Sequence, residues 1–315
     1  MYNYENYTKV KEEIERRRTE ARAKADYRSD LLRSRSPEIA KIDEELSGTG
    51  LLLFKTACAG GDVSAIRKRN QELCQRRREA MVALGYPADY TDIQYTCKKC
   101  SDTGFLANGK MCSCFREELI RATIASSGIG KLIEKQSFDN FSLAQFEPGS
   151  EEYEKMKHVL DSAKEYVERF AKSQGNLLLI GKTGTGKTHI STAIARGVIS
   201  KGFDVVYDSV QNIISDFEAD KFRSGYSSEV ERSAKYLECD LLIVDDLGTE
   251  FSNQFTVSCL YNLLNTRQNR GKATVISTNL SPKELSNQYD DRFYSRIIGS
   301  DCEVLRFIGK DNRVE

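Results

Sequence analysis

The stretch GKTGTGKT at residues 181–188 combines three glycines with lysine and threonine side chains. The apolar run NLLLI precedes it and HISTAIARGVIS follows, an order that predicts a strand, a glycine-rich turn and a helix. Such a turn directs backbone N–H groups at phosphates, its lysine binds the β- and γ-phosphates, and its last threonine holds Mg²⁺. We therefore predict that ATP and Mg²⁺ bind here, with contacts from Gly181, Thr183, Gly184, Thr185, Gly186, Lys187, Thr188 and His189.

Two carboxylates follow a second apolar run, LLIVDDLG. Four apolar residues place Asp245 and Asp246 at the carboxyl end of a buried strand, where open α/β sheets bind ligands. We expect Asp245 to orient Mg²⁺ and Asp246 to polarise the attacking water. Asn279, at the end of the run VISTN, is expected at the same edge, where it would sense the γ-phosphate. A simple turn role for Asn279 stays open.

The stretch DDRFYSRI contains two arginines four residues apart, Arg292 and Arg296. On a helix they would share one face, from which either could reach the nucleotide of a neighbouring subunit. A structural salt bridge is the alternative for each. Arg313, near the end of the sequence, is a candidate for contact with the nucleotide of its own subunit.

Four of the nine cysteines lie in the block YTCKKCSDTGFLANGKMCSCF. The spacing Cys97-x₂-Cys100-x₁₁-Cys112-x-Cys114 provides four soft ligands, as tetrahedral Zn²⁺ requires. The intervening Asn108-Gly109 pair is typical of a hairpin turn, which would bring the two cysteine pairs together. A redox dithiol, free structural thiols and an iron–sulfur cluster remain alternatives. The other cysteines are expected to be buried: Cys58, Cys74, Cys239, Cys259 and Cys302.

The sequence around these motifs shows two different patterns of predicted secondary structure. Residues 1–90 are rich in helix formers and charge, with Ser36 and Pro37 predicting a helix start and Gly85 a helix end. After about residue 136, apolar runs at 176–181, 203–209, 240–247 and 273–279 alternate with helical segments, which indicates a parallel α/β sheet. We predict a helical partner-binding region (1–94), a zinc ribbon with a linker (95–135) and an ATPase domain (136–315).

The bulk composition sets further limits. The 315 residues are 39% hydrophobic and 30% charged, and the formal net charge is zero. No apolar run is long enough to cross a membrane and the start lacks a signal-peptide core, so a cytoplasmic location without a membrane partner is expected. Nucleic-acid binding would depend on a local patch. Segment 211–239 contains a candidate patch of aromatic and basic residues for single-stranded DNA, namely Phe217, Lys221, Phe222, Arg223 and Tyr226. An ordinary amphipathic helix with an exposed loop is the alternative.

The phosphate loop, VDD, STN and DRFYSRI, in this order, resemble an AAA+ ATPase of the initiator and loader branch. Residues 136–315 resemble the ATPase domain of bacterial DnaC/DnaI-type replicative-helicase loaders, and SFDNF resembles the entry segment of that domain. The cysteine block, C-x₂-C, DTG and C-x-C, also resembles the corresponding block of DnaI-type loaders. The resemblance implies that Arg296 is an arginine finger and Arg313 a sensor-2 arginine. It also implies a hexameric replicative helicase bound by the N-terminal part, with single-stranded DNA and self-assembly through the ATPase part.

Two other functions compete with the loader. A transposition helper of the IstB kind has a similar ATPase domain but commonly lacks the four-cysteine block. A zinc-ribbon DNA-binding adaptor, whose ATP site only stabilises its assembly, would show no turnover.

Overall fold

The computed structural model describes residues 3–171, 175–222, 231–299 and 302–311. The chain divides into two compact units, one of Lys11–Phe115 and one of Met1–Val10 with Arg116–Glu315. This division falls inside the segment 95–135, for which we expect a zinc ribbon and a linker. The boundaries at 94 and 135 stay predictions.

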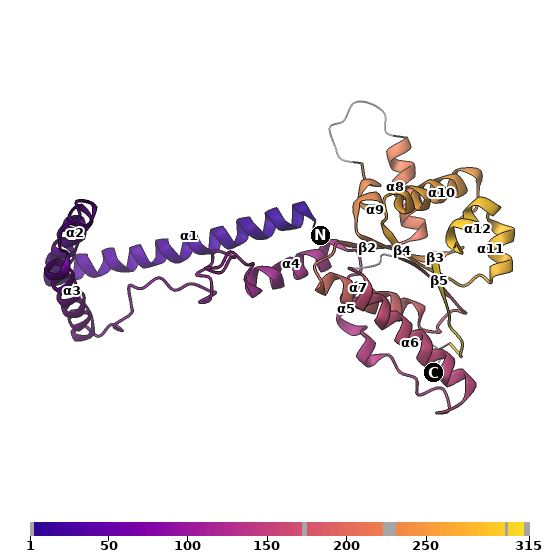
Figure 1. Ribbon diagram of the computed structural model, residues 1–315, viewed down its shortest axis with the longest axis horizontal. Coiled ribbons are helices and arrows are strands. Elements are labelled where there is room, and N and C mark those ends of the chain that lie inside the picture. Colours follow the sequence, from indigo (N-terminus) through magenta and orange to yellow (C-terminus); the bar gives the residue numbers. More distant parts are fainter. Residues whose placement is uncertain (1–2, 172–174, 223–230, 300–301, 312–315) are drawn as a thin grey trace. The chain divides into compact units, whose positions relative to one another are not determined.

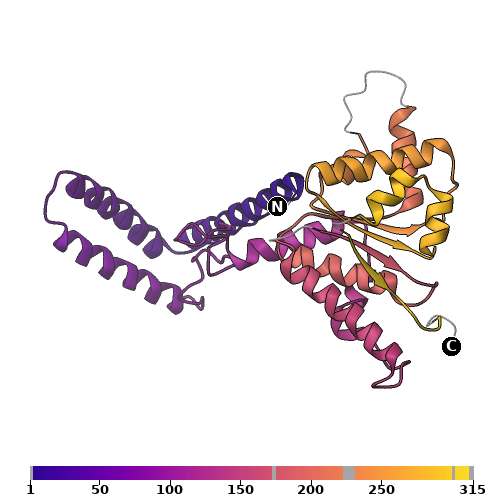
Figure 2. The same ribbon diagram turned by 45° about the vertical axis from the view of Figure 1, so that its right-hand side comes forward.

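Three long helices dominate the first unit, α1 (Tyr4–Arg35), α2 (Pro37–Cys58) and α3 (Ser64–Ala83). The predicted helix start is confirmed, because Ser36 accepts a hydrogen bond from Ile39 N and Pro37 occupies the first turn. The predicted helix end is also confirmed, since Gly85 follows α3 with a φ of 83°. Helices α2 and α3 lie side by side in both views (Figures 1 and 2).

A buried ion cluster joins these helices. The Asp43 carboxylate, which is 6% exposed, accepts hydrogen bonds from Arg33 Nε (2.8 Å) and Arg77 Nε (2.5 Å). Burial alone would raise the pKa of Asp43, but the hydrogen bonds and charges of Arg77 and Arg33 outweigh it and hold the pKa below its usual range. The charged pairs therefore link α1, α2 and α3 at one point, where removal of either arginine would leave the buried Asp43 carboxylate less well paired.

The second unit is a parallel sheet between two layers of helices. Its five strands run in the order β2-β3-β4-β1-β5, with bounds β1 (Asn176–Ile180), β2 (Val205–Ser209), β3 (Leu241–Leu247), β4 (Ala273–Thr278) and β5 (Cys302–Arg306). The helical segments are α4 (Ser113–Ser126), α5 (Leu132–Lys135), η1 (Phe138–Asn140), α6 (Glu151–Arg169), α7 (Lys187–Ser200), α8 (Val210–Lys221), α9 (Ala234–Glu238), α10 (Gln254–Asn269), α11 (Pro282–Gln288) and α12 (Asp291–Ile297).

Each face of the sheet carries its own apolar core. Helices α6 and α7 cover one face, and α8, α10 and α12 cover the other (Figure 1). The predicted parallel α/β fold and the four predicted strands are confirmed. The edge strand β5, whose residues are mostly half-buried, is an addition that the sequence did not predict. In the described part of the chain, no helix is long and apolar enough to cross a membrane.

Candidate nucleotide and metal sites

The predicted phosphate loop lies between β1 and α7, as its sequence requires. Gly184 and Gly186 adopt φ values of 75° and 98°, a left-handed conformation that side-chain-bearing residues rarely adopt. Helix α7 begins at Lys187, so its N-terminal N–H groups and its positive dipole end face the loop. This arrangement fits the phosphates of a nucleotide.

The segment SFDNF packs against the start of α7. The His189 Nε2–H group donates to the Ser137 carbonyl oxygen (2.8 Å) and to Asn140 Oδ1 (3.0 Å). The Phe141 ring lies edge-on to the His189 ring, with centroids 5.3 Å apart. A Cβ atom on Gly186 would lie 2.7 Å from Phe141 Cε2, so a glycine is needed there for close packing. The segment therefore packs directly beside the phosphate loop, against Gly186 and His189.

Lys187 occupies the centre of the site. Its side chain is 5% exposed, and its Nζ donates to the carbonyl oxygens of Gly181 (2.7 Å) and Lys182 (2.8 Å) and to Asn279 Oδ1 (2.6 Å). The Asn279 side chain therefore lies at the phosphate loop, as the sequence predicts for its position at the end of β4.

Asp245 lies at the end of β3 and is largely buried. Its carboxylate accepts hydrogen bonds from Tyr207 OH (2.5 Å), from the Ser277 hydroxyl and, at 3.5 Å, from the Thr188 hydroxyl. The first two partners were not predicted, although both lie on strands that end at this edge. Burial, together with the Asp245 charge, raises the pKa of Tyr207, so that its hydroxyl stays protonated and donates. Thr188 and Asp245 are thus positioned to hold Mg²⁺ together.

Asp246 is turned away from the sheet by a β-bulge. The β3–β4 register shifts between Val244 and Leu247, and Asp246 adopts a φ of 57°. Its backbone N–H donates to Ser277 Oγ at 3.0 Å. The bulge therefore separates the two neighbouring carboxylates, so that Asp245 stays buried in the sheet while Asp246 lines an open cleft.

The cleft has a volume of about 560 Å³. Six of the predicted nucleotide-binding residues line it, together with the predicted catalytic residues Asp246 and Asn279; the six are Thr183, Gly184, Gly186, Lys187, Thr188 and His189. The predicted binding residues Gly181, Thr185 and Asp245 are not part of its lining. At one end the lining also includes Leu132, Gln136, Asn140, Phe141 and Ser142, which the sequence analysis did not single out as site residues. These side chains come from α5 and the segment that precedes α6, so only the fold brings them to the loop. The cleft therefore combines the phosphate loop with a second wall of two apolar and three polar side chains, and its volume is in the range of small-molecule sites.

The candidate finger arginines lie in a separate cavity of about 590 Å³, on the predicted helix α12. Arg296 Nη1 donates to Gln268 Oε1 (3.2 Å), and Gln268 Nε2 donates to the Arg296 carbonyl oxygen (3.0 Å). Arg292 is exposed. Among the described residues, neither arginine lines the cleft of its own chain. Arg313 lies outside the described residues.

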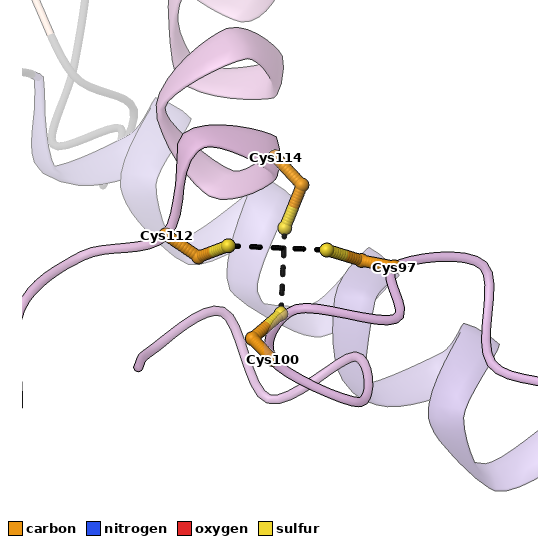
Figure 3. Close-up of side chains that lie close together, drawn as sticks. All are labelled: Cys97, Cys100, Cys112 and Cys114. Carbon is orange, nitrogen blue, oxygen red and sulfur yellow. Dashed lines mark hydrogen bonds between the residues drawn. The ribbon is translucent and has the colours of Figure 1, made fainter. Parts of the chain in front are cut away.

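The four predicted zinc ligands converge in the first unit. Figure 3 shows the sulfur atoms of Cys97, Cys100, Cys112 and Cys114 pointing toward one another, all within 4.8 Å. The Cys97–Cys112 and Cys100–Cys114 sulfur separations are 3.8 and 3.5 Å. A tetrahedron with Zn–S bonds of about 2.3 Å has sulfur separations of about 3.8 Å. The thiol set therefore fits Zn²⁺ with only small side-chain adjustments.

The backbone around the cysteines supports this geometry. Phe105 and Met111 form an antiparallel bridge across the predicted Asn108-Gly109 turn. The buried Asp102 carboxylate accepts the backbone N–H groups of Thr96 and Cys97, both at 2.8 Å. Burial, followed by the neighbouring sulfurs, raises the pKa of the Cys114 thiol. A bound cation would reverse that shift, because it stabilises the thiolates.

The remaining cysteines divide by location. Cys239 and Cys259 are buried as predicted, and Cys302 is half-buried. For Cys58 and Cys74 the prediction was wrong, because both thiols are exposed on the α2–α3 hairpin. Their helices have only one apolar face, and these positions lie off it.

The predicted DNA segment has a mixed structure. Phe217 stacks on Tyr236 (centroids 6.2 Å apart) and packs against the core, so its ring is not free for a base. Phe222 is 73% exposed, and Lys221 Nζ lies 5.7 Å from its ring centroid. Arg223 and Tyr226 lie outside the described residues.

Comparison with known proteins relates the second unit to a family of ATP-binding proteins. A model of the family described as "IstB-like ATP binding protein" matches residues 129–299, more than half of the chain. The replicative helicase loader DnaC of Escherichia coli (strain K12) is 26% identical over 187 residues, 59% of this chain and 73% of the loader. DnaC of Buchnera aphidicola subsp. Baizongia pistaciae (strain Bp) is also 26% identical, over 175 residues, 55% of this chain and 68% of that protein.

Among solved structures, a DnaC helicase loader aligns with a TM-score of 0.48 and 20% identity, covering 56% of this chain and 99% of that one. The predicted resemblance to the DnaC-type AAA+ proteins is confirmed by the curated relatives. The chain belongs to the family of IstB-like ATP-binding proteins.

Proposed function

We propose that the protein is an ATP-hydrolysing loader of a replicative helicase. In the nucleotide cleft, Lys187 binds the β- and γ-phosphates, Thr188 and Asp245 hold Mg²⁺, and Asp246 polarises the attacking water. Bound Mg²⁺ would neutralise charge that develops on the phosphates. Asn279, already hydrogen-bonded to Lys187, exchanges that contact for the γ-phosphate or the water.

We propose that catalysis also needs a second subunit. Arg292 and Arg296 lie on α12, outside the cleft of their own chain among the described residues. An arginine finger stabilises charge in the transition state of phosphoryl transfer. If Arg296 has this role, it acts on the ATP of a neighbour, and turnover depends on assembly.

The observation that carries the loader assignment is the 187-residue match to DnaC together with the intact cleft. The residues expected to grip the helicase lie in 1–135, and the segment 211–239 is expected to contact single-stranded DNA through Lys221 and the exposed Phe222. The four cysteines would hold a structural Zn²⁺ that fixes the ribbon of the partner-binding part.

A transposition helper is the second candidate, because the matching family model carries the IstB description. The four-cysteine block favours the loader. A zinc-ribbon adaptor with a structural ATP site is a third, and it predicts negligible ATP turnover with or without single-stranded DNA.

The decisive experiment mixes the full chain with the replicative helicase encoded by the same genome. A loader should form a complex with the helicase in size-exclusion chromatography. It should also load the helicase onto circular single-stranded DNA, which has no free end onto which a ring-shaped helicase could thread by itself. The Lys187→Ala variant should still bind the helicase but should not complete the ATP-dependent cycle. Absence of a helicase complex under all nucleotide conditions would exclude the loader and favour the transposition helper.

A further inference from the structure

We propose that Glu250 and Tyr289 position the arginine helix α12 in response to the chain's own nucleotide cleft. The two residues would transmit the state of the loop after β3 to Arg296, which faces the neighbouring subunit. The inference rests on the proposed function, since it assigns a task to a helix that carries the proposed finger.

The connection begins in the cleft. Asp246 and Thr249 both line it, and the Asp246 carbonyl oxygen accepts the backbone N–H (3.2 Å) and the hydroxyl (2.9 Å) of Thr249. Between them Gly248 adopts a φ of 99°, and a Cβ atom there would overlap the Leu280 side chain. The loop from Asp246 to Thr249 is thus a tight turn packed against the β4 end, and contacts with nucleotide or water at Asp246 act on the whole turn.

The turn ends at a buried carboxylate. Glu250 is 7% exposed, and its Oε2 accepts the Gly248 N–H at 2.8 Å while its Oε1 accepts the Tyr289 hydroxyl. Burial of a carboxylate is unfavourable unless donors compensate it. A leucine would fill this space without that cost, so packing alone does not explain a glutamate here. The two donors come from the cleft loop and from the segment before α12, and Glu250 joins them.

Tyr289 in turn packs against the apolar face of α12. It is 3% exposed, and its ring centroid lies 4.5 Å from that of Phe293. Burial, then the hydrogen bond to Glu250, raises the pKa of Tyr289, which keeps the hydroxyl a donor. Asp290 caps the helix by accepting the Phe293 N–H at 2.7 Å. Movement of the Tyr289 ring therefore moves α12.

A neighbouring face of α12, about 100° around the helix from its buried residues, carries the finger candidates. Arg292 and Arg296 line the second cavity, and Arg296 is held there by its two hydrogen bonds with Gln268. Because α12 has only seven residues, it moves as a rigid piece. A change at Asp246 that shifts Glu250 would tilt α12 and change where Arg296 points.

The test uses Tyr289→Phe, which removes one hydroxyl and keeps the ring. The matched control is Tyr294→Phe, since Tyr294 lies on α12 itself and its hydroxyl makes no hydrogen bond among the described residues. In the full-length protein we expect ATP affinity within about twofold of wild type for both variants, but hydrolysis about five- to tenfold slower only for Tyr289→Phe, the loss expected for one hydrogen bond. Glu250→Gln, which keeps an acceptor, should retain more activity than Glu250→Ala.

A second readout does not depend on turnover. Amide hydrogen exchange in residues 290–297 should change when a non-hydrolysable ATP analogue binds to wild type and to Tyr294→Phe, and this change should be lost in Tyr289→Phe. An unaltered nucleotide-dependent change in Tyr289→Phe would overturn the coupling. Failure of the finger itself is distinguishable: Arg296→Ala would then hydrolyse ATP normally, whereas the exchange experiment would still report whether cleft and helix are linked.

Discussion

Removal of the Lys187 ammonium should weaken ATP binding far more than removal of any other single charge in the loop. Lys187 Nζ donates to two loop carbonyls and to Asn279 Oδ1, at 2.6 to 2.8 Å. A phosphate group can replace these acceptors, and each charge-assisted hydrogen bond contributes about 1.5–3 kcal/mol. Two such bonds give about 3–6 kcal/mol, so the Kd for ATP in Lys187→Ala should rise by roughly 10²- to 10⁴-fold.

The matched control is Lys182→Ala in the same loop. Its side chain is exposed, and only its carbonyl oxygen contacts the Lys187 ammonium. Both variants lose one positive charge near the phosphates, but an exposed charge is screened and its loss should cost less than about 1 kcal/mol. Isothermal titration with Mg-ATP at fixed salt compares the two. Equal losses of affinity in both variants would refute the reasoning. The loss of affinity would then come from the lower positive charge of the loop and not from the buried contacts of Lys187.

Four further outcomes are expected. Asp246→Asn should bind ATP with near-normal affinity but hydrolyse it at least about tenfold more slowly, measured by phosphate release. The purified, reduced protein should contain about one zinc per chain, and Cys97→Ser should release it and loosen residues 95–115 without loss of ATP binding, as metal analysis and hydrogen exchange would report. Arg296→Ala mixed with Lys187→Ala should regain part of the hydrolysis that each lacks alone, provided light scattering confirms assembly. The arginines hold the pKa of Asp43 in the folded protein below its value in the unfolded chain. The ionised Asp43 therefore stabilises the fold above about pH 4, and this stabilisation is lost as the pH falls through the pKa of the folded protein. Asp43→Asn should consequently make the free energy of unfolding less dependent on pH in this range.

The parts of the site that the sequence predicts are those encoded within a few residues. The phosphate loop, the Asp245–Asp246 pair and the cysteine hairpin each combine residue type and spacing in one short stretch. The strands before them are short apolar runs with a polar end, so their placement at one sheet edge follows from parallel topology. These local patterns were sufficient to predict which side chains gather at the nucleotide cleft and in the four-cysteine cluster.

Residues brought to the site by long-range packing were not predicted. Tyr207 and Ser277 contact Asp245 from neighbouring strands, and Phe141 packs on Gly186. Although Ser277 and Phe141 lie in the quoted stretches STN and SFDNF, nothing in the sequence assigns these contacts to them. The interpretation of Phe217 as a DNA contact failed for the same reason. Its ring lies on the inner face of α8 against Tyr236, and an aromatic residue with basic neighbours fits a core as well as a nucleobase.

The β-bulge shows why an adjacent pair of carboxylates can have two roles. In a regular strand, Asp245 and Asp246 would point to opposite faces of the sheet, and one of them would enter an apolar core. The extra residue between Val244 and Leu247 instead leaves Asp245 among hydroxyl donors and turns Asp246 into the cleft. The same bulge starts the turn that ends at Glu250, whose partner Tyr289 lies 39 residues further along the chain. The proposed metal binding, the proposed water activation and the proposed positioning of α12 therefore share one local distortion of β3, and we expect a substitution that regularised it to disturb all three together.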